Sequence, residues 1–163
     1  MSAARKFVLL GATGSIGENT LRVLRKHPDK LELVGISAKS QADKLASIAR
    51  EFSVPYACLQ SAPPEGISFP DGTSLLEGDA GIGSLAALPD ADFVVVAVVG
   101  AAGLRPTLAA LEAGKDVVLA NKEALVVGGE IVTRTAEENG ARIIPADSEH
   151  NAVFQCLMGQ PEY

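Results

Sequence analysis

Residues 7–20 read FVLLGATGSIGENT and carry the strongest local structural signal in the sequence. A short apolar run leads into glycines at positions 11, 14 and 17, and a helical pattern follows. In a turn between a strand and a helix, Gly11 permits the tight turn, Gly14 lets the backbone approach a pyrophosphate, and Gly17 lets the helix pack closely on the sheet. Free N–H groups at the helix start would bind the phosphates. The stretch therefore predicts a dinucleotide-binding turn, the alternative being ordinary turn glycines.

Apolar runs and helical stretches alternate along the rest of the chain, which is typical of βαβ units. The prediction is an α/β, Rossmann-like, doubly wound and mostly parallel sheet with helices on both faces. Strands are expected at 6–10, 31–37, 56–59, 74–77, 92–99, 116–120 and 142–145, and helices at 16–26, 41–52, 82–88, 104–113 and 123–139. Apart from its short strand and helix, the segment 61–87 is expected to be irregular because it is rich in glycine and proline.

Composition excludes several classes of protein. The 163 residues suffice for one domain, and the net charge of −6 opposes nucleic-acid binding, which needs clustered cations. No apolar run approaches the length of a membrane span, and the start lacks the apolar core of a secretory signal, so a soluble cytoplasmic protein is expected. The two cysteines lie far apart without C-x-x-C spacing, which argues against a disulfide framework or a zinc site.

Residues 37–40, Ser-Ala-Lys-Ser, follow the second expected strand and bear on the choice of dinucleotide. An NAD site usually has an acid there to accept hydrogen bonds from the adenosine ribose, whereas a 2′-phosphate requires donors and positive charge. No acid is present, so the sequence favours NADP. The alternative is that Lys39 is an ordinary solvated lysine.

Asn121, Lys122 and Glu123 stand between the fifth long strand and the next helix. A lysine there can meet a phosphate or polarise a carbonyl, and an asparagine can hold a ribose or nicotinamide group. A polar helix start would explain Glu123 through the helix dipole, but it explains Lys122 poorly because a cation is unfavourable at that end. The cluster therefore favours a functional role.

Near the end of the chain, residues 145–155 read PADSEHNAVFQ. In extended backbone, side chains two positions apart point the same way, so Asp147 and Glu149 could face one hard cation while Ser148 points aside or caps the following helix. Oxygen ligands suit Mg²⁺ or Mn²⁺. Taken alone, the pair could equally be two acids in a solvated loop, and His150 could be their partner or a polar helix residue.

All these polar groups follow the carboxyl ends of expected parallel strands. In open α/β sheets that edge binds ligands, because its loops and helix N-termini face one crevice. We therefore expect the glycine turn, the asparagine-lysine-glutamate cluster and the acid pair to converge.

Four stretches, GATGSIGENTL, VVGAAGLRPTLAAL, LANKEALVVGG and PADSEHNAVFQCL, together resemble the amino-terminal part of the 1-deoxy-D-xylulose 5-phosphate reductoisomerase family. The resemblance covers most of the chain. It implies NADPH binding by Thr13, Gly14, Ser15, Ile16, Ala38, Lys39, Ser40, Asn121 and Glu123. It implies sugar phosphate contacts from Lys122, Ser148 and Glu149, catalytic roles for Lys122 and Glu149, and metal binding by Asp147 and Glu149. Family members often have Gly-Lys-Asn where this chain has Ala-Lys-Ser at 38–40.

The activity that this resemblance implies is rearrangement and NADPH-dependent reduction of 1-deoxy-D-xylulose 5-phosphate to 2-C-methyl-D-erythritol 4-phosphate, in non-mevalonate isoprenoid biosynthesis. Family enzymes are longer homodimers, with a downstream catalytic domain that supplies a third acidic metal ligand. Residues 1–150 would be the NADPH-binding domain and 151–163 the start of the connection, in a truncated chain without turnover of its own. A free-standing NADP sensor and the nucleotide domain of another NADP-dependent dehydrogenase, such as a semialdehyde dehydrogenase, are the alternatives.

Overall fold

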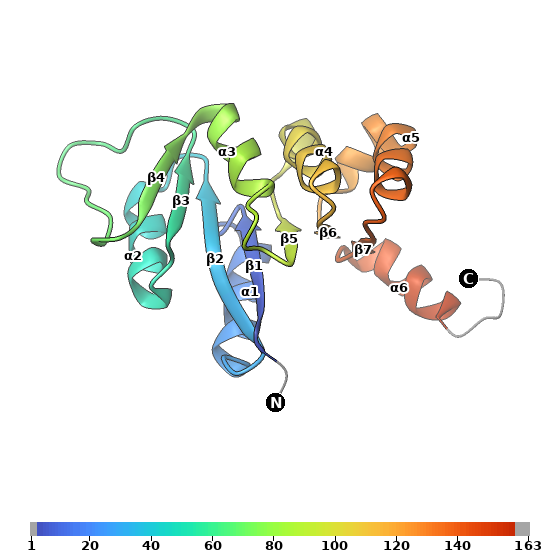
Figure 1. Ribbon diagram of the computed structural model, residues 1–163, viewed down its shortest axis with the longest axis horizontal. Helices are drawn as coiled ribbons and strands as arrows, with labels where there is room; N and C mark the ends of the chain where they lie inside the picture. Colours follow the sequence, from blue (N-terminus) through green and yellow to red (C-terminus); the bar gives the residue numbers. More distant parts are fainter. Residues whose placement is uncertain (1–2, 159–163) are drawn as a thin grey trace.

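Seven short strands form one sheet in the computed structural model, which describes residues 3–158 (Figure 1). Every neighbouring pair is parallel, in the order β4-β3-β2-β1-β5-β6-β7. The strands are β1 (Arg5–Leu10), β2 (Leu31–Ala38), β3 (Tyr56–Leu59), β4 (Ser74–Glu77), β5 (Phe93–Val96), β6 (Asp116–Leu119) and β7 (Ile143–Pro145). After β4 the chain crosses to the other side of β1, so the strand order reverses between β1 and β5.

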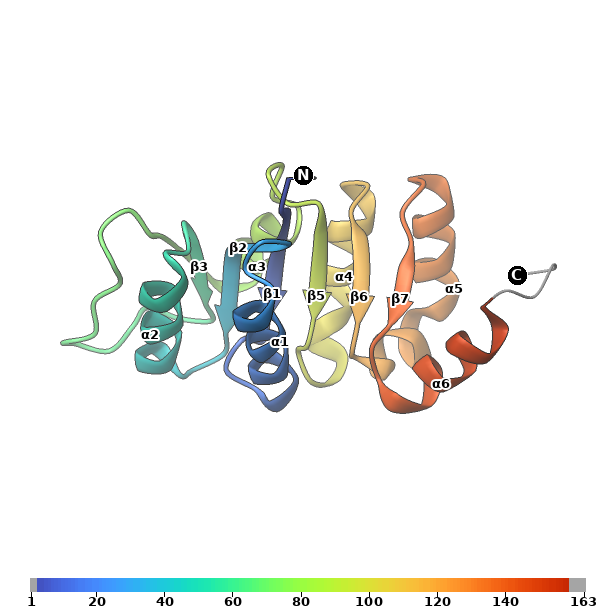
Figure 2. The same cartoon turned by 90° about the horizontal axis from the view of Figure 1, so that it is seen from below.

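Helices cover both faces of the sheet, as Figure 2 shows. They are α1 (Ser15–Lys26), α2 (Ala42–Phe52), α3 (Gly78–Ala86), the 3-10 helix η1 (Gly100–Gly103), α4 (Leu104–Glu112), α5 (Lys122–Glu138) and α6 (Ser148–Leu157). Alternation along β1 builds the two cores, because Phe7 and Leu9 pack with α1 and α2 while Val8 and Leu10 pack with α3, α4 and α5. This confirms the predicted fold class.

Most elements confirm their predicted ranges, with differences where tertiary context intervenes. The expected strand 92–99 stops at Val96 because its neighbours β1 and β6 end at Leu10 and Leu119, leaving later residues no strand to pair with. Helix α3 begins at Gly78 rather than at residue 82. Gly114 and Gly140, each one residue beyond the C-cap of α4 and α5, adopt φ values of 68° and 64°, the left-handed conformation in which glycine commonly ends a helix.

The predicted division after residue 150 falls inside α6, which runs across it. No α6 residue is buried, and Val153, Phe154 and Met158 at this end of the chain are exposed. Residues 159–163 of the predicted connection lie outside the described part of the chain, and the division itself stays a prediction. Among residues 3–158, no helix is both long enough and apolar enough to cross a bilayer.

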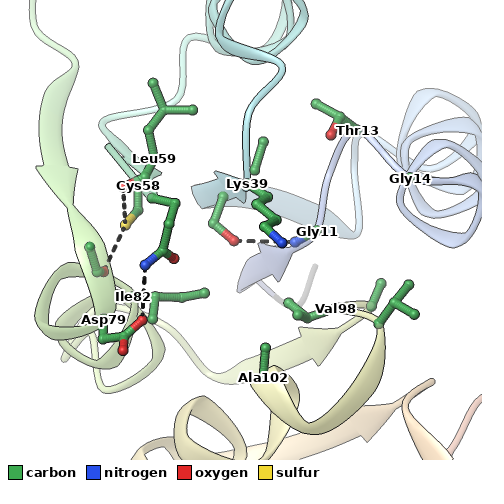
Figure 3. Close-up of a pocket in the computed structure, with 16 residues that line it drawn as sticks. Gly11, Thr13, Gly14, Lys39, Cys58, Leu59, Asp79, Ile82, Val98 and Ala102 are labelled. Carbon is green, nitrogen blue, oxygen red and sulfur yellow. Dashed lines mark hydrogen bonds between the residues drawn. The ribbon is translucent and has the colours of Figure 1, made fainter. Parts of the chain in front are cut away.

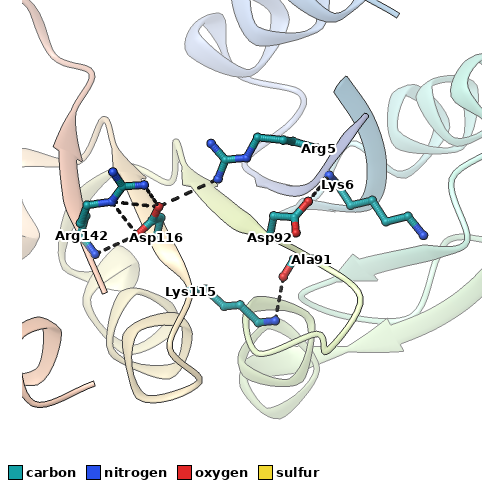
Figure 4. A network of polar contacts seen from close by, with 7 residues as sticks. All are labelled: Arg5, Lys6, Ala91, Asp92, Lys115, Asp116 and Arg142. Carbon is teal, nitrogen blue, oxygen red and sulfur yellow. Dashed lines mark hydrogen bonds and ion pairs between the residues drawn. The ribbon is translucent and has the colours of Figure 1, made fainter. Parts of the chain in front are cut away.

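At the amino ends of the strands, Asp116 ties three strands together (Figure 4). Its carboxylate accepts hydrogen bonds from the Arg142 backbone N–H at 3.0 Å and from the Arg142 guanidinium Nη2 at 2.5 Å. Arg5 Nη2 lies 3.9 Å from the same carboxylate. Hydrogen bonds from Arg142 are the main reason that the pKa of Asp116 lies below its usual value, and they outweigh the effect of burial, which raises it.

We expect Asp116→Asn to lower the free energy of unfolding at pH 7 by about 1 kcal/mol, a modest loss because the Arg142 side chain is well exposed and screened by solvent. Because the pKa of Asp116 is lower in the folded state, its ionised carboxylate stabilises the protein at pH values above its pKa in the unfolded chain, which is about 4. This stabilisation disappears as the pH falls through the lower pKa of the folded state. Urea unfolding should therefore separate the two proteins at pH 7 and not at strongly acidic pH. Asp90→Asn, at an exposed position on the same edge, should match the wild type throughout.

Candidate functional site

Two adjoining cavities, of about 660 and 230 Å³, open at the carboxyl ends of the strands. Both are lined by Gly14 and by the residues after β5, at the point where the strand order reverses. The larger one has these lining residues: Gly11, Thr13, Gly14, Ser37, Ala38, Lys39, Cys58, Leu59, Gln60, Gly78, Asp79, Ile82, Ala97, Val98, Val99 and Ala102. The smaller one is lined by Gly14, Ser15, Ile16, Ala97, Val98, Val99, Ala120, Lys122, Glu123 and Asp147. We call the two together the cofactor cleft.

The glycine turn forms the middle of the cofactor cleft. Gly11 has a φ of 85°, and an added Cβ would lie 2.6 Å from the Ala97 carbonyl oxygen. At Gly17 a Cβ would lie 2.4 Å from the Gly11 oxygen, so α1 can pack against the turn only with glycine there. Among the described residues, no side chain caps the start of α1. The first N–H groups of the helix are therefore available to bind an anion. The predicted roles of Gly11 and Gly17 are confirmed.

A lysine that the sequence analysis missed braces this turn from α2. Lys44 Nζ donates a hydrogen bond to the Thr13 carbonyl oxygen at 2.9 Å and forms an ion pair with Glu18 on α1. The hydrogen bond from Lys44 is the largest reason that the pKa of Glu18 lies below its usual value. Lys44 and Thr13 are 31 residues apart, and they meet because α2 lies beside α1. No local sequence pattern predicts this contact.

The end of β2 places two predicted residues in the larger cavity (Figure 3). Ala38 and Lys39 both line it, whereas Ser40 lines neither cavity. The buried Ser37 hydroxyl accepts a hydrogen bond from Gly11 N at 3.2 Å, which fastens the end of β2 to the glycine turn. Ser37 therefore positions the glycine turn, a role that its place in the stretch 37–40, which lacks acids, did not indicate.

Asn121 is buried, and its side chain makes hydrogen bonds within the protein. As the N-cap of α5 it accepts a hydrogen bond from Ala124 N at 2.7 Å, while its Nδ2 donates to the Val98 oxygen and, at 2.8 Å, to the Gly100 oxygen. Gly103 must be glycine because a Cβ there would lie 2.5 Å from Asn121 Nδ2. Asn121 lines neither cavity, so its side chain fastens the loop after β5 to α5 beneath the cleft.

Lys122 and Glu123, at the start of α5, line the smaller cavity together with Asp147 from the end of β7. Glu149 lies close enough to Lys122 and Asp147 for their charges to influence the pKa of its carboxylate. A hydrogen bond from its own backbone N–H, then one from Ser148, then the charge of Lys122 hold the pKa of Glu149 below its usual value. The expected convergence of this cluster with the glycine turn is thus present at one edge of the sheet.

The acid pair differs from expectation in its local geometry. The prediction of extended backbone through Asp147 and Glu149 is wrong, because Asp147 is the N-cap of α6 and Ser148 its first residue. Asp147 Oδ2 accepts a hydrogen bond from His150 N at 3.0 Å and lies 2.7 Å from His150 Nδ1, while Ser148 donates to Glu149 Oε2 at 2.9 Å. Ser148 is therefore not the cap, and His150 is the partner of Asp147.

The surroundings of Asp147 favour the charged form of its carboxylate. Its burial raises its pKa, but hydrogen bonds from the backbone N–H and the ring of His150 outweigh that effect and leave the pKa below its usual value. Within residues 3–158, no group of three or more acids, histidines or cysteines is placed to hold a metal ion. Asp147 and Glu149 offer two carboxylates, which fits Mg²⁺ because magnesium takes one or two carboxylates and completes its shell with water and substrate.

Comparison with known proteins agrees with this geometry. Residues 7–129 match the family model of 1-deoxy-D-xylulose 5-phosphate reductoisomerase. The 1-deoxy-D-xylulose 5-phosphate reductoisomerase of Ralstonia pickettii (strain 12J) is 50% identical over 167 residues, a match that covers 95% of this chain and 41% of that protein. The same enzyme of Pseudomonas putida (strain W619) is 45% identical over 165 residues, covering 98% of this chain and 42% of that protein.

Solved structures of the same enzyme superpose closely. A crystal structure of DOX-P reductoisomerase in complex with NADPH, fosmidomycin and magnesium matches with a TM-score of 0.87 and 42% identity over 95% of this chain and 39% of that one. The Zymomonas mobilis enzyme in complex with NADPH matches with a TM-score of 0.83 and 34% identity over 94% of this chain and 41% of that one. The chain spans about two fifths of the length of these relatives. It belongs to the 1-deoxy-D-xylulose 5-phosphate reductoisomerase family.

Proposed function

We propose that this chain binds NADPH in the cofactor cleft and presents Lys122, Ser148 and the Asp147–Glu149 pair to a sugar phosphate. In the full-length family protein, these groups would serve the conversion of 1-deoxy-D-xylulose 5-phosphate to 2-C-methyl-D-erythritol 4-phosphate in non-mevalonate isoprenoid biosynthesis. That protein is proposed to be a cytoplasmic homodimer, and this chain alone to have no turnover.

The observation that carries the proposal is the continuity of the cofactor cleft. The two cavities share Gly14, Ala97, Val98 and Val99 in their linings, and together they extend from Lys39 after β2, past the first turn of α1, to Lys122 and Asp147 after β6 and β7. Its direction matches a dinucleotide with the pyrophosphate on the α1 N-terminus, the adenosine side near β2 and the nicotinamide toward β6. Relatives of known structure have been crystallised with NADPH and with magnesium, which supports the same assignment here.

The chain's own residues would prepare the chemistry in three ways. The α1 amide groups would hold the pyrophosphate of the cofactor and Lys39 its 2′-phosphate, which fixes the position of the nicotinamide. Lys122 donates hydrogen bonds to the sugar phosphate. Asp147 and Glu149 would hold the divalent metal, with Asp147 oriented by His150. When bound, Mg²⁺ or Mn²⁺ would supply electrostatic stabilisation of the negative charge that develops on the substrate oxygens.

Calorimetric titration of the chain with NADPH and with NADH tests the cofactor assignment. We expect NADPH to bind at least about tenfold more tightly, since one charge-assisted hydrogen bond to the 2′-phosphate is worth that much. Equal affinity for both would contradict the proposal. Adding 1-deoxy-D-xylulose 5-phosphate and Mn²⁺ should cause no NADPH oxidation until the remaining three fifths of a family enzyme is supplied in trans. A full-length wild-type family enzyme serves as the positive control. If that enzyme oxidises NADPH and the reconstituted mixture does not, the result would favour a sensor function.

A further inference from the structure

The larger cavity is lined by two polar side chains that have no role in the phosphate binding proposed for the glycine turn and Lys39. Gln60, directly after β3, and Asp79, in the first turn of α3, both line it. Gln60 Nε2 donates a hydrogen bond to Asp79 Oδ1 at 3.1 Å. Figure 3 shows Asp79 beside Ile82, across the cavity from Lys39 and Thr13.

The place of this pair follows from the order of the strands, and the argument rests on the proposed NADPH binding. The pyrophosphate lies at Gly14 and the 2′-phosphate at Lys39, while the nicotinamide lies toward Lys122. The base must then lie at the opposite end of the cofactor cleft, beyond the end of β2. In the sheet order β3 and β4 come next, and their ends carry Gln60 and Asp79.

The walls of this end suit a flat aromatic ring. Ala38, Leu59, Ile82 and Ala102 line the cavity with apolar groups, and Leu59 is buried beneath it. Apolar walls with a few polar groups are the usual way in which a protein holds the faces of a ring and recognises its edge. The Gln60–Asp79 pair supplies such polar groups.

We propose that Asp79, held in place by Gln60, recognises the 6-amino group of adenine and discriminates against 6-oxopurines. A carboxylate only accepts hydrogen bonds, so the amide of Gln60 must turn its Nε2 toward Asp79, and this fixes the orientation of both groups. Asp79 Oδ2 then accepts a hydrogen bond from the 6-amino group, and the second Nε2 hydrogen of Gln60 faces a ring nitrogen. An oxygen at position 6 would bring acceptor against acceptor.

The probe is the reduced hypoxanthine analogue of NADPH, in which an oxygen replaces the 6-amino group of the base. We expect the wild-type chain to bind it about tenfold more weakly than NADPH, a modest factor because Gln60 and Asp79 are exposed to solvent. In Asp79→Asn the side-chain amide can donate to that oxygen, so the tenfold preference should shrink or reverse. Asp71→Asn, an exposed acid outside the cavity lining, should keep the wild-type preference.

The outcomes separate the two proposals. Equal affinity of the wild-type chain for both nucleotides overturns the assignment of Asp79 and leaves NADPH binding intact. A uniform loss of affinity for both nucleotides in Asp79→Asn, with the preference unchanged, also overturns it, because that result indicates a structural role alone. Failure of the wild-type chain to bind either nucleotide overturns this assignment together with the cofactor proposal.

Discussion

Gly17→Ala is expected to destabilise the chain by about 3 kcal/mol and to abolish NADPH binding, because the added methyl group meets rigid backbone. The new Cβ would lie 2.4 Å from the Gly11 carbonyl oxygen and 2.6 Å from that of Ala12. Helix α1 must then move away from the turn, and its first N–H groups leave the pyrophosphate position. Urea unfolding followed by circular dichroism measures the stability, and calorimetry measures the binding.

Gly129→Ala is the matched control for this change. Gly129 also lies in a helix, but an added Cβ there meets nothing within 4 Å. Alanine is favoured over glycine inside a helix, so this variant should be as stable as the wild type or slightly more so, with unchanged NADPH affinity. If Gly17→Ala behaved like Gly129→Ala, close packing of α1 on the turn would not be what the glycine provides.

Lys39→Glu is expected to weaken NADPH binding by about 100-fold, because it removes a charge-assisted hydrogen bond and adds repulsion toward the 2′-phosphate. NADH lacks that phosphate, and a glutamate at the end of β2 can accept hydrogen bonds from its ribose hydroxyls. Affinity for NADH should therefore stay the same or rise. Parallel calorimetric titrations with both nucleotides measure the change in preference.

Lys30→Glu tests whether the effect is local or due to net charge. Lys30 is exposed in the turn before β2, at the end of the strands opposite the cofactor cleft. Lys30→Glu and Lys39→Glu change the net charge by the same amount. Lys30→Glu should leave the preference for NADPH unchanged. A similar loss of NADPH affinity in both variants would mean that Lys39 is an ordinary solvated lysine, the alternative that the sequence left open.

The sequence predicts the fold well because its signals are local. Continuous apolar runs mark strands that are buried on both faces, and the spacing of Gly11, Gly14 and Gly17 marks the turn between β1 and α1. Parallel strands then bring their carboxyl ends to one edge. For this reason Lys39, Lys122 and Asp147, which are far apart in the chain, could be expected around one cleft from the sequence alone.

What the sequence could not predict depends on contacts between distant segments. Lys44 reaches Thr13 only because α1 and α2 lie side by side, and the hydrogen bonds of Asn121 depend on the path of the loop after β5. Asp147 and Ser148 are both good N-cap residues, so the sequence does not decide which of them starts α6. Gln60 lies directly before the segment 61–87 and Asp79 lies within it, and the glycines and prolines of this segment carry no periodic signal.

Strand β1 begins at Arg5, and the Asp116–Arg142 contact lies at the same, amino-terminal ends of the strands. The cofactor cleft opens at the opposite, carboxyl-terminal ends. A fluorescent protein or a surface tether fused ahead of Ala4 would therefore project away from the bound nucleotide. With the proposed NADPH binding, this arrangement would suit an immobilised NADPH biosensor, because the optical label and the recognition element would lie at opposite ends of the strands.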